Sequence, residues 1–284
     1  MIDLPENMHT SMSGWTSFHV SVEDGVAEVE LSTGATGNLL NFAFWRELPE
    51  VFHQLDRDSR VRAVILSATG AHFSYGIDLK MMAAIFGPAV IDGGLAASRA
   101  DLRRAIIDVQ NSISAVADCS KPVIAAVQGW CIGGAVDLIS AADIRYASSD
   151  ARFSVREIKV AMVADLGSLQ RLPGIIGEGH LRELALTGDD IDAARARRIG
   201  LVNDVLDDHS ATVGHARAVA RRIAQNAPLP VQGVKKILDY SRRTSIQDGL
   251  TYVATWNSAF LPSDDLTEAI SAVFEKRKPN FRGQ

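Results

Sequence analysis

Two glycine loops in the sequence have residue types suited to holding a negatively charged oxygen. The first, GAHFSYGIDL, turns at Gly76 and would aim the N–H of Ile77 at a ligand. The second, QGWCIGG, would present the N–H of Gly134 at the start of a helix. Preorganised N–H groups, aided by a helix dipole, stabilise an oxyanion that develops during a reaction. Because glycines after strands are also common turn devices, neither loop identifies a site by itself.

Three carboxylic acids follow the second loop. Asp137 lies in the first turn of the helix expected there, Glu157 follows 20 residues later and Asp165 another 8. Asp165 comes directly after the apolar run MVA, and an acid buried there must be paired, hydrogen-bonded or raised in pKa. Such groups are candidates for proton transfer. Two local alternatives remain open: Asp137 could complement the helix dipole, and Asp165 could cap a helix beginning near Leu166.

The elements that must position these groups are short apolar runs that feed loops and then helices, a pattern that favours an α/β core with buried strands. The expected elements of this core are a hairpin at 18–31, a helix at 42–57, a strand at 61–67, a helix at 100–117, a strand at 122–127, a short helix from Gly134, and strands at 144–147 and 153–155. Pro49 should kink or restart the helix that contains it.

The C-terminal part of the chain has a different character. From about residue 209 several helices follow one another, and Ser263–Asp264–Asp265 marks the start of the last one. The sequence therefore predicts a loose polar arm at 1–17, an α/β core at 18–207 and a helical C-terminal region at 208–284.

Composition limits the possible partners. The 284 residues include 34 acidic and 29 basic side chains, a net charge of −5 that argues against nucleic acid or an anionic membrane as partner. A small anionic ligand held by local donors stays possible. Cys119 and Cys131 lack the neighbours of a zinc site or disulfide framework and are expected to be buried thiols. The N-terminus lacks a signal-peptide pattern and no apolar run is long enough to span a bilayer, which predicts a cytoplasmic protein.

Five segments occur in an order and spacing that mark a family: FSYGIDL, KPVIAAVQGWCIGGAVDL, ADIRYA, LQRLP and FEKRKPNF. Together they resemble the crotonase (enoyl-CoA hydratase/isomerase) superfamily, from about residue 18 to the C-terminus. The resemblance implies an α/β fold, a spiral of ββα turns with a C-terminal helical trimerisation region, and an acyl-CoA thioester as substrate. It also implies that the N–H groups of Ile77 and Gly134 form the oxyanion hole, the pair that the glycine loops suggest.

The acids indicate which group of that family the chain resembles. Family hydratases have glutamates at the positions of Asp137 and Glu157, and usually glycine at the position of Asp165. The trio here resembles the Δ3,5-Δ2,4-dienoyl-CoA isomerases, in which two acids flank an extended diene. The resemblance implies that Asp165 is the base at C2, that Glu157 delivers a proton at C6, and that Asp137 orients or tunes the pair. The pKa values of Glu157 and Asp165 should be pushed apart, and the sequence leaves open which of the two acids is protonated at rest.

The resemblance also implies how coenzyme A is held. It offers Tyr75, Asp78 and Lys80 beside the first loop, and Lys276 near the C-terminus, reaching a phosphate in its own or a neighbouring subunit. Both lysines could equally be solvated surface charges. The segment STGATGNLLN is uncharged, although many family members have a basic residue there. No metal ion or redox cofactor is expected, and the expected assembly is a homotrimer or a dimer of trimers.

Three functions compete on this basis. The first is isomerisation of a 3,5-dienoyl-CoA to the 2,4-dienoyl-CoA. The second is hydration of a 2-enoyl-CoA, which should tolerate Asp165→Asn. The third is a non-catalytic relative that binds acyl-CoA without turnover, and the three acids count against it.

Overall fold

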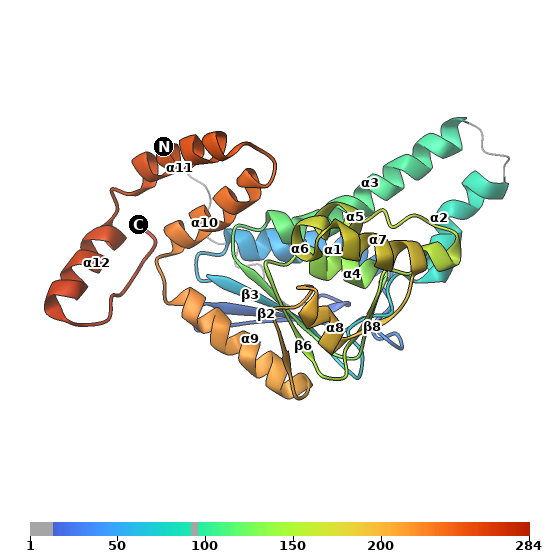
Figure 1. Cartoon of the computed structure of the whole chain (residues 1–284), viewed down its shortest axis with the longest axis horizontal. Helices are drawn as coiled ribbons and strands as arrows, with labels where there is room; N and C mark the ends of the chain where they lie inside the picture. The colour runs from blue at the N-terminus through green and yellow to red at the C-terminus, as the bar shows by residue number, and fades with distance from the viewer. Residues whose placement is uncertain (1–13, 92–95) are drawn as a thin grey trace.

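The computed structural model describes residues 14–91 and 96–284, and a six-stranded sheet lies at its centre (Figure 1). In spatial order its strands are β1 (Phe18–Glu23), β2 (Val26–Leu31), β3 (Ala63–Ala68), β4 (Val123–Val127), β6 (Ile144–Ser148) and β9 (Asp204–Leu206). β1 and β2 form the expected antiparallel hairpin around Asp24–Gly25, and the other neighbours are parallel. Parallel neighbours need crossover connections, and two of these connections contain the glycine loops.

Helices bury both faces of this sheet. α1 (Phe42–Arg57), with α3 (Ala96–Asp118) beside it, covers one face, and α9 (His209–Ala224) covers the other (Figure 1). In β3, Leu66 belongs to the core under α1 and its neighbour Ile65 to the core under α9. Consecutive side chains of a strand point to opposite faces, so a strand covered on both sides is mostly apolar.

A second, three-stranded sheet and several short helices connect these layers. The strands are β5 (Trp130–Ile132), β7 (Arg152–Ser154) and β8 (Ile191–Asp192). The short helices are α4 (Gly134–Ser140), the 3-10 helix η1 (Glu157–Val160), α5 (Ser168–Arg171), α6 (Pro173–Ile176), α7 (Glu178–Thr187) and α8 (Ala193–Arg198). Because β5 leads into the second glycine loop and β7 leads toward Glu157, this small sheet fixes the distance between loop and acid.

α1 continues through Pro49, so of the two outcomes expected from the sequence the restart is wrong and the kink stays a prediction. Proline has no N–H, and the carbonyl of Trp45 therefore loses its helical donor. The hydroxyl of Ser112 on α3 donates to that carbonyl at 2.7 Å. A side chain from the neighbouring helix thus satisfies the acceptor that proline leaves open.

The sequence did not predict α2 (Leu79–Ile91), which directly follows the first glycine loop. Its residues form an almost uniformly apolar run that contains Gly87 and Pro88, so helical periodicity is weak. α3 begins at Ala96, earlier than expected. Together α2 and α3 extend from the body of the molecule as an arm, called the α2–α3 arm below (Figure 1).

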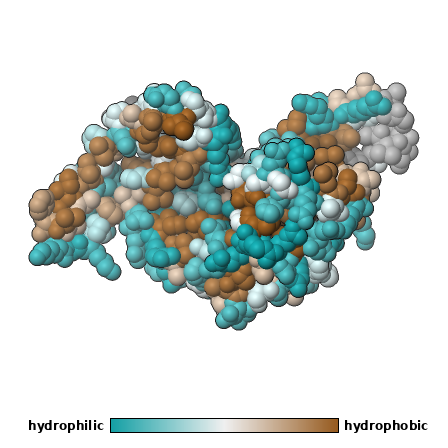
Figure 2. All heavy atoms as spheres, viewed as in Figure 1, coloured by the Kyte–Doolittle hydropathy of each residue, from teal (hydrophilic) through white to brown (hydrophobic). Residues whose placement is uncertain are grey.

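Three helices extend beyond the sheet at the opposite end of the molecule (Figure 1). They are α10 (Pro228–Ser241), α11 (Ile246–Phe260) and α12 (Asp264–Glu275). The last begins as expected, because the side chain of Ser263 accepts the N–H of Leu266. Figure 2 shows apolar side chains gathered on the surface of this end.

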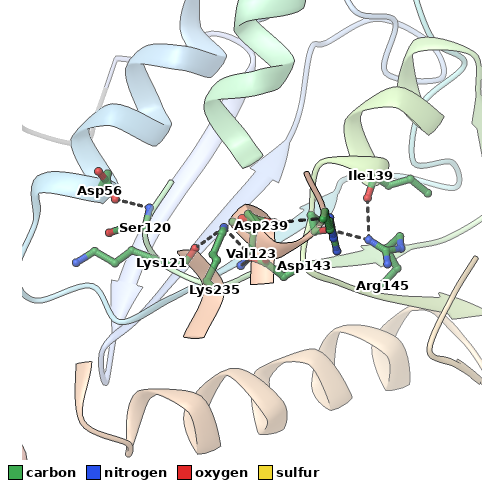
Figure 3. Close-up of polar contacts among 11 residues, drawn as sticks. Asp56, Ser120, Lys121, Val123, Ile139, Asp143, Arg145, Lys235 and Asp239 are labelled. Atoms are coloured by element: carbon green, nitrogen blue, oxygen red, sulfur yellow. Dashed lines mark hydrogen bonds and ion pairs between the residues drawn. The ribbon is translucent and has the colours of Figure 1, made fainter. Parts of the chain in front are cut away.

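A partly buried ion pair joins α10 to the sheet (Figure 3). Nζ of Lys235 donates to Oδ2 of Asp143 at 2.8 Å and to the carbonyl of Lys121 at 3.2 Å. The same Asp143 oxygen accepts the N–H of Val123 at 2.7 Å. Since Lys121 precedes β4 and Asp143 precedes β6, this contact determines where α10 leaves the core.

The proposed division at residues 17 and 207 stays a prediction. Residues 1–13 of the expected arm lie outside the described residues, and the N–H groups of Thr16 and Ser17 donate to the carboxylate of Glu47. Cys119 and Cys131 are buried free thiols, as expected.

In the described ranges, no helix is both long and apolar enough to cross a membrane.

Candidate active site

The structure brings the two glycine loops together. Ser74 accepts the N–H of Ile132 at 3.1 Å and donates its own N–H to Trp130 at 2.9 Å. A Cβ at position 76 would lie 3.4 Å from the nitrogen of Gly134 and 2.5 Å from the carbonyl oxygen of Ile132. Gly76 has φ +85°, so both its conformation and its surroundings require glycine.

Ile77 and Gly134 both have N–H groups available for a ligand. Leu40 accepts the N–H of Asp78 and donates to the carbonyl of Gly76, which leaves the N–H of Ile77 between them unused. Gly134 is the first residue of α4, where N–H groups lack helical acceptors. Among residues 14–91 and 96–284 no protein acceptor takes either N–H. Two adjacent donors of this kind can stabilise a thioester oxyanion.

Asp137 is buried in α4 and is engaged with a different segment of the chain. Its Oδ1 accepts the N–H of Ser168 at 2.5 Å. Burial raises the pKa of Asp137 to about 6, although the hydrogen bond from Ser168 opposes this. A role limited to complementing the dipole of α4 is therefore incomplete, because Asp137 also holds the start of α5 in place.

Glu157 lies over the start of α4. A Cβ at position 133 would lie 3.0 Å from its Oε1. Its Oε2 is buried, and the part of the chain that the structure describes offers it no hydrogen-bond partner. Burial, followed by the charge of Asp137, raises the pKa of Glu157 to about 7. At neutral pH this carboxyl group is partly protonated and able to donate a proton.

Asp165 lies in a segment without helix or strand between η1 and α5. α5 begins at Ser168 with Gly167 as its N-cap, so the interpretation of Asp165 as a helix cap is wrong. Burial raises the pKa of Asp165. Its charge in turn raises the pKa values of Asp137 and Glu157, which identifies the three acids as one electrostatic group.

The expected coenzyme A residues are divided between two ends of the molecule. The Tyr75 ring lies against Gly37, where a Cβ would be 1.9 Å from its Cδ2. Asp78 accepts the N–H of Lys80 at 2.8 Å, at the exposed start of α2. Lys276 caps α12, which lies at the opposite end of the molecule from α2 (Figure 1). Within one chain Lys276 is therefore remote from the other three residues.

Two residues that hold the Asp165 segment were not predicted as site residues. Nε2 of Gln110 donates to the carbonyl of Asp165 at 2.7 Å. Nη1 of Arg171 donates to the carbonyl of Leu166 at 3.2 Å. Arg171 belongs to the family motif LQRLP, a signal that could have identified it, whereas the sequence around Gln110 contains no such signal. Groups of three or more His, Cys, Asp or Glu side chains suited to a metal ion are absent from the described residues.

Comparison with known proteins gives relatives at 41–46% identity that share one activity in their names. A model of the enoyl-CoA hydratase/isomerase family matches residues 21–284. A peroxisomal Δ(3,5)-Δ(2,4)-dienoyl-CoA isomerase of Arabidopsis thaliana is 46% identical over 244 residues, which cover 86% of this chain and 88% of that protein. A mitochondrial enzyme of the same name from Homo sapiens is 41% identical over 260 residues, covering 91% of this chain and 79% of that protein.

Solved structures give the same fold. The crystal structure of an enoyl-CoA hydratase from Bacillus anthracis has a TM-score of 0.85 and 29% identity, and the match covers 94% of this chain and 100% of that one. The expected crotonase fold, α/β with C-terminal helices, is confirmed. On the evidence of the family match and of these relatives, the chain belongs to the enoyl-CoA hydratase/isomerase (crotonase) family.

Proposed function

We propose that this protein is a Δ3,5-Δ2,4-dienoyl-CoA isomerase. The observation that carries the proposal is the group of three coupled acids, with Asp165 in addition to Asp137 and Glu157, beside two unused N–H donors. Relatives at 41–46% identity that are named for this activity support it. The substrate class, an acyl-CoA thioester, follows from the family.

The reaction moves two double bonds and requires one proton to leave and another to arrive. Asp165 removes a proton from C2, and the electron pair of that C–H bond becomes part of a dienolate that extends from the thioester oxygen to C6. The N–H groups of Ile77 and Gly134 bind the oxygen, where loss of one such donor typically costs about 3 kcal/mol. Glu157 then donates its proton to C6, which gives the 2,4-dienoyl-CoA. The turnover leaves Asp165 protonated and Glu157 ionised, and exchange with solvent restores both.

The protonation states support these roles. The pKa of Glu157 is raised to about 7, so its protonated form is available at neutral pH for donation to C6. Asp165 lies outside η1 in a less buried position, which suits a carboxylate that must be ionised to accept a proton. Asp137 binds the N–H of Ser168 and acts as a positioning residue for the Asp165 segment.

Exposed apolar side chains on the C-terminal helices support an assembly of several subunits. α11 buries little of its surface in one chain, and α10 and α12 have many exposed apolar side chains: Val234, Leu238, Leu266, Ile270, Val273 and Phe274. Surfaces of this kind normally lie in subunit interfaces. We propose a homotrimer or a dimer of trimers, in which Lys276 reaches the coenzyme A of a neighbouring subunit. Sedimentation equilibrium gives the subunit number, and a monomer would refute the assembly.

Curated relatives are described as peroxisomal or mitochondrial. The cytoplasmic location expected from the sequence therefore stays a prediction for this chain.

The experiment compares two substrates with the same preparation. Purified protein mixed with a 3,5-dienoyl-CoA should generate the ultraviolet absorbance of the conjugated 2,4-dienoyl-CoA. Asp165→Asn should abolish this signal and retain acyl-CoA binding, while Asp207→Asn, which changes an exposed aspartate, is the matched control. A protein that hydrates crotonyl-CoA but gives no diene signal would be a hydratase. Binding without either reaction would identify a non-catalytic relative.

A further inference from the structure

The segment that contains Asp165 depends on side chains for its position. Residues 163–167 form neither helix nor strand. The carbonyl of Asp165 accepts Nε2 of Gln110 at 2.7 Å, and the carbonyl of Leu166 accepts Nη1 of Arg171 at 3.2 Å. A catalytic base on irregular backbone needs such contacts, because an ångström of displacement can cost about 100-fold in rate.

Both contacts lead to one face of α3. Gln110 contacts the segment directly, and Arg171 is held by Ser114, whose Oγ lies 3.1 Å from Nη2. Residues four apart lie on the same side of a helix, so Gln110 and Ser114 form a two-point support. Arg171 fills the space beside Gly167, where a Cβ would lie 1.8 Å from Nη1. The support is therefore closely packed.

The α2–α3 arm thus connects to the oxyanion loop and to the base at C2. α2 begins at Leu79, two residues after the oxyanion donor Ile77, and α3 carries the support for Asp165. We propose that Gln110 is a positioning residue: through its hydrogen bond to the Asp165 carbonyl, the α2–α3 arm sets the base at C2 relative to the bound thioester oxygen. This proposal rests on the proposed isomerase function.

The test uses three variants of α3. Gln110→Ala removes the donor, and Gln110→Glu keeps the size of the side chain but loses the donor when ionised. Asn111→Ala changes the exposed neighbouring amide and is the matched control. With a 3,5-dienoyl-CoA we expect both Gln110 variants to lower kcat about 10-fold to 100-fold. KM and the unfolding temperature should equal those of Asn111→Ala, because Gln110 contacts the base segment rather than the substrate.

Other results would overturn the proposal. A Gln110→Glu variant with the kcat of the wild type would mean that only side-chain volume matters. A lower unfolding temperature with unchanged kcat would indicate a purely structural residue.

A second measurement needs no substrate. Amide hydrogen exchange over residues 163–168 should be faster in Gln110→Ala than in Asn111→Ala, and equal exchange would refute the hydrogen-bond support. If the wild type lacks isomerase activity, the proposed function fails, while the exchange result still decides whether Gln110 holds the segment.

Discussion

Glu157 should destabilise the folded protein as the pH rises. Burial and the nearby carboxylates raise its pKa from 4.5 to about 7. The folded protein therefore retains a proton over a range in which the unfolded chain loses it, and the free energy of unfolding falls from pH 4.5 to pH 7. Since each pKa unit corresponds to about 1.4 kcal/mol, the decrease reaches about 3 kcal/mol above pH 7.

Glu157→Gln removes this dependence on pH. The free energy of unfolding of the variant minus that of the wild type should be about 3 kcal/mol larger at pH 8 than at pH 4. The amide also changes the contacts of a buried atom that lacks a partner, but that contribution is the same at both pH values and cancels. Urea unfolding at one fixed protein concentration measures the difference, because subunit association makes stability depend on concentration.

The same change should abolish proton delivery to C6, so the variant gains stability at pH 8 and loses isomerisation. Glu50→Gln, on an exposed glutamate of α1, is the matched control for unfolding. A stability difference between wild type and Glu157→Gln that is constant from pH 4 to pH 8 would refute the reasoning. It would mean that the surroundings of Glu157 in the folded protein do not destabilise its ionised carboxylate.

Three further predictions concern other parts of the structure. Gly76→Ala forces a Cβ to 2.5 Å from a carbonyl oxygen and should lower kcat/KM about 100-fold by displacing the first oxyanion donor; unchanged kinetics would contradict that geometry. Gly167→Ala should lower the free energy of unfolding by about 2 kcal/mol in urea titrations. Gly174→Ala, where a Cβ meets open space, should not. Lys235→Met should cost about 2 kcal/mol, and adding Asp143→Asn should recover part of it; additive losses would argue against the ion pair.

Local patterns in the sequence were sufficient for much of the core. The alternation around Asp24–Gly25 predicted the hairpin, and the apolar runs predicted β3 and β4 because strands buried on both faces are mostly apolar. The glycine loops pointed to Ile77 and Gly134 because a turn between strand and helix exposes backbone N–H groups.

Features that depend on distant contacts could not be read locally. α1 passes Pro49 because Ser112, far along the chain, donates to the carbonyl of Trp45. α2 was missed because an apolar run containing a Gly–Pro pair has no clear helical period.

The same holds for the candidate site, where contacts between distant parts of the chain could not be predicted. The three acids were predicted from the sequence, but Arg171 was not, and the hydrogen bond from Gln110 spans 55 residues and has no local signal. The distance of Lys276 from the first glycine loop also had no local signal, because it depends on α12 and α2 lying at opposite ends of the folded molecule.

The central claim is that one proton leaves C2 and a different proton arrives at C6. Isomerisation of a 3,5-dienoyl-CoA in deuterium oxide, with the product analysed by NMR, tests this most directly. The account predicts a 2,4-dienoyl-CoA that carries deuterium at C6, delivered from Glu157 after exchange with solvent, and no such product from Asp165→Asn. A 3-hydroxyacyl-CoA product, or a 2,4-dienoyl-CoA without deuterium at C6, would contradict it.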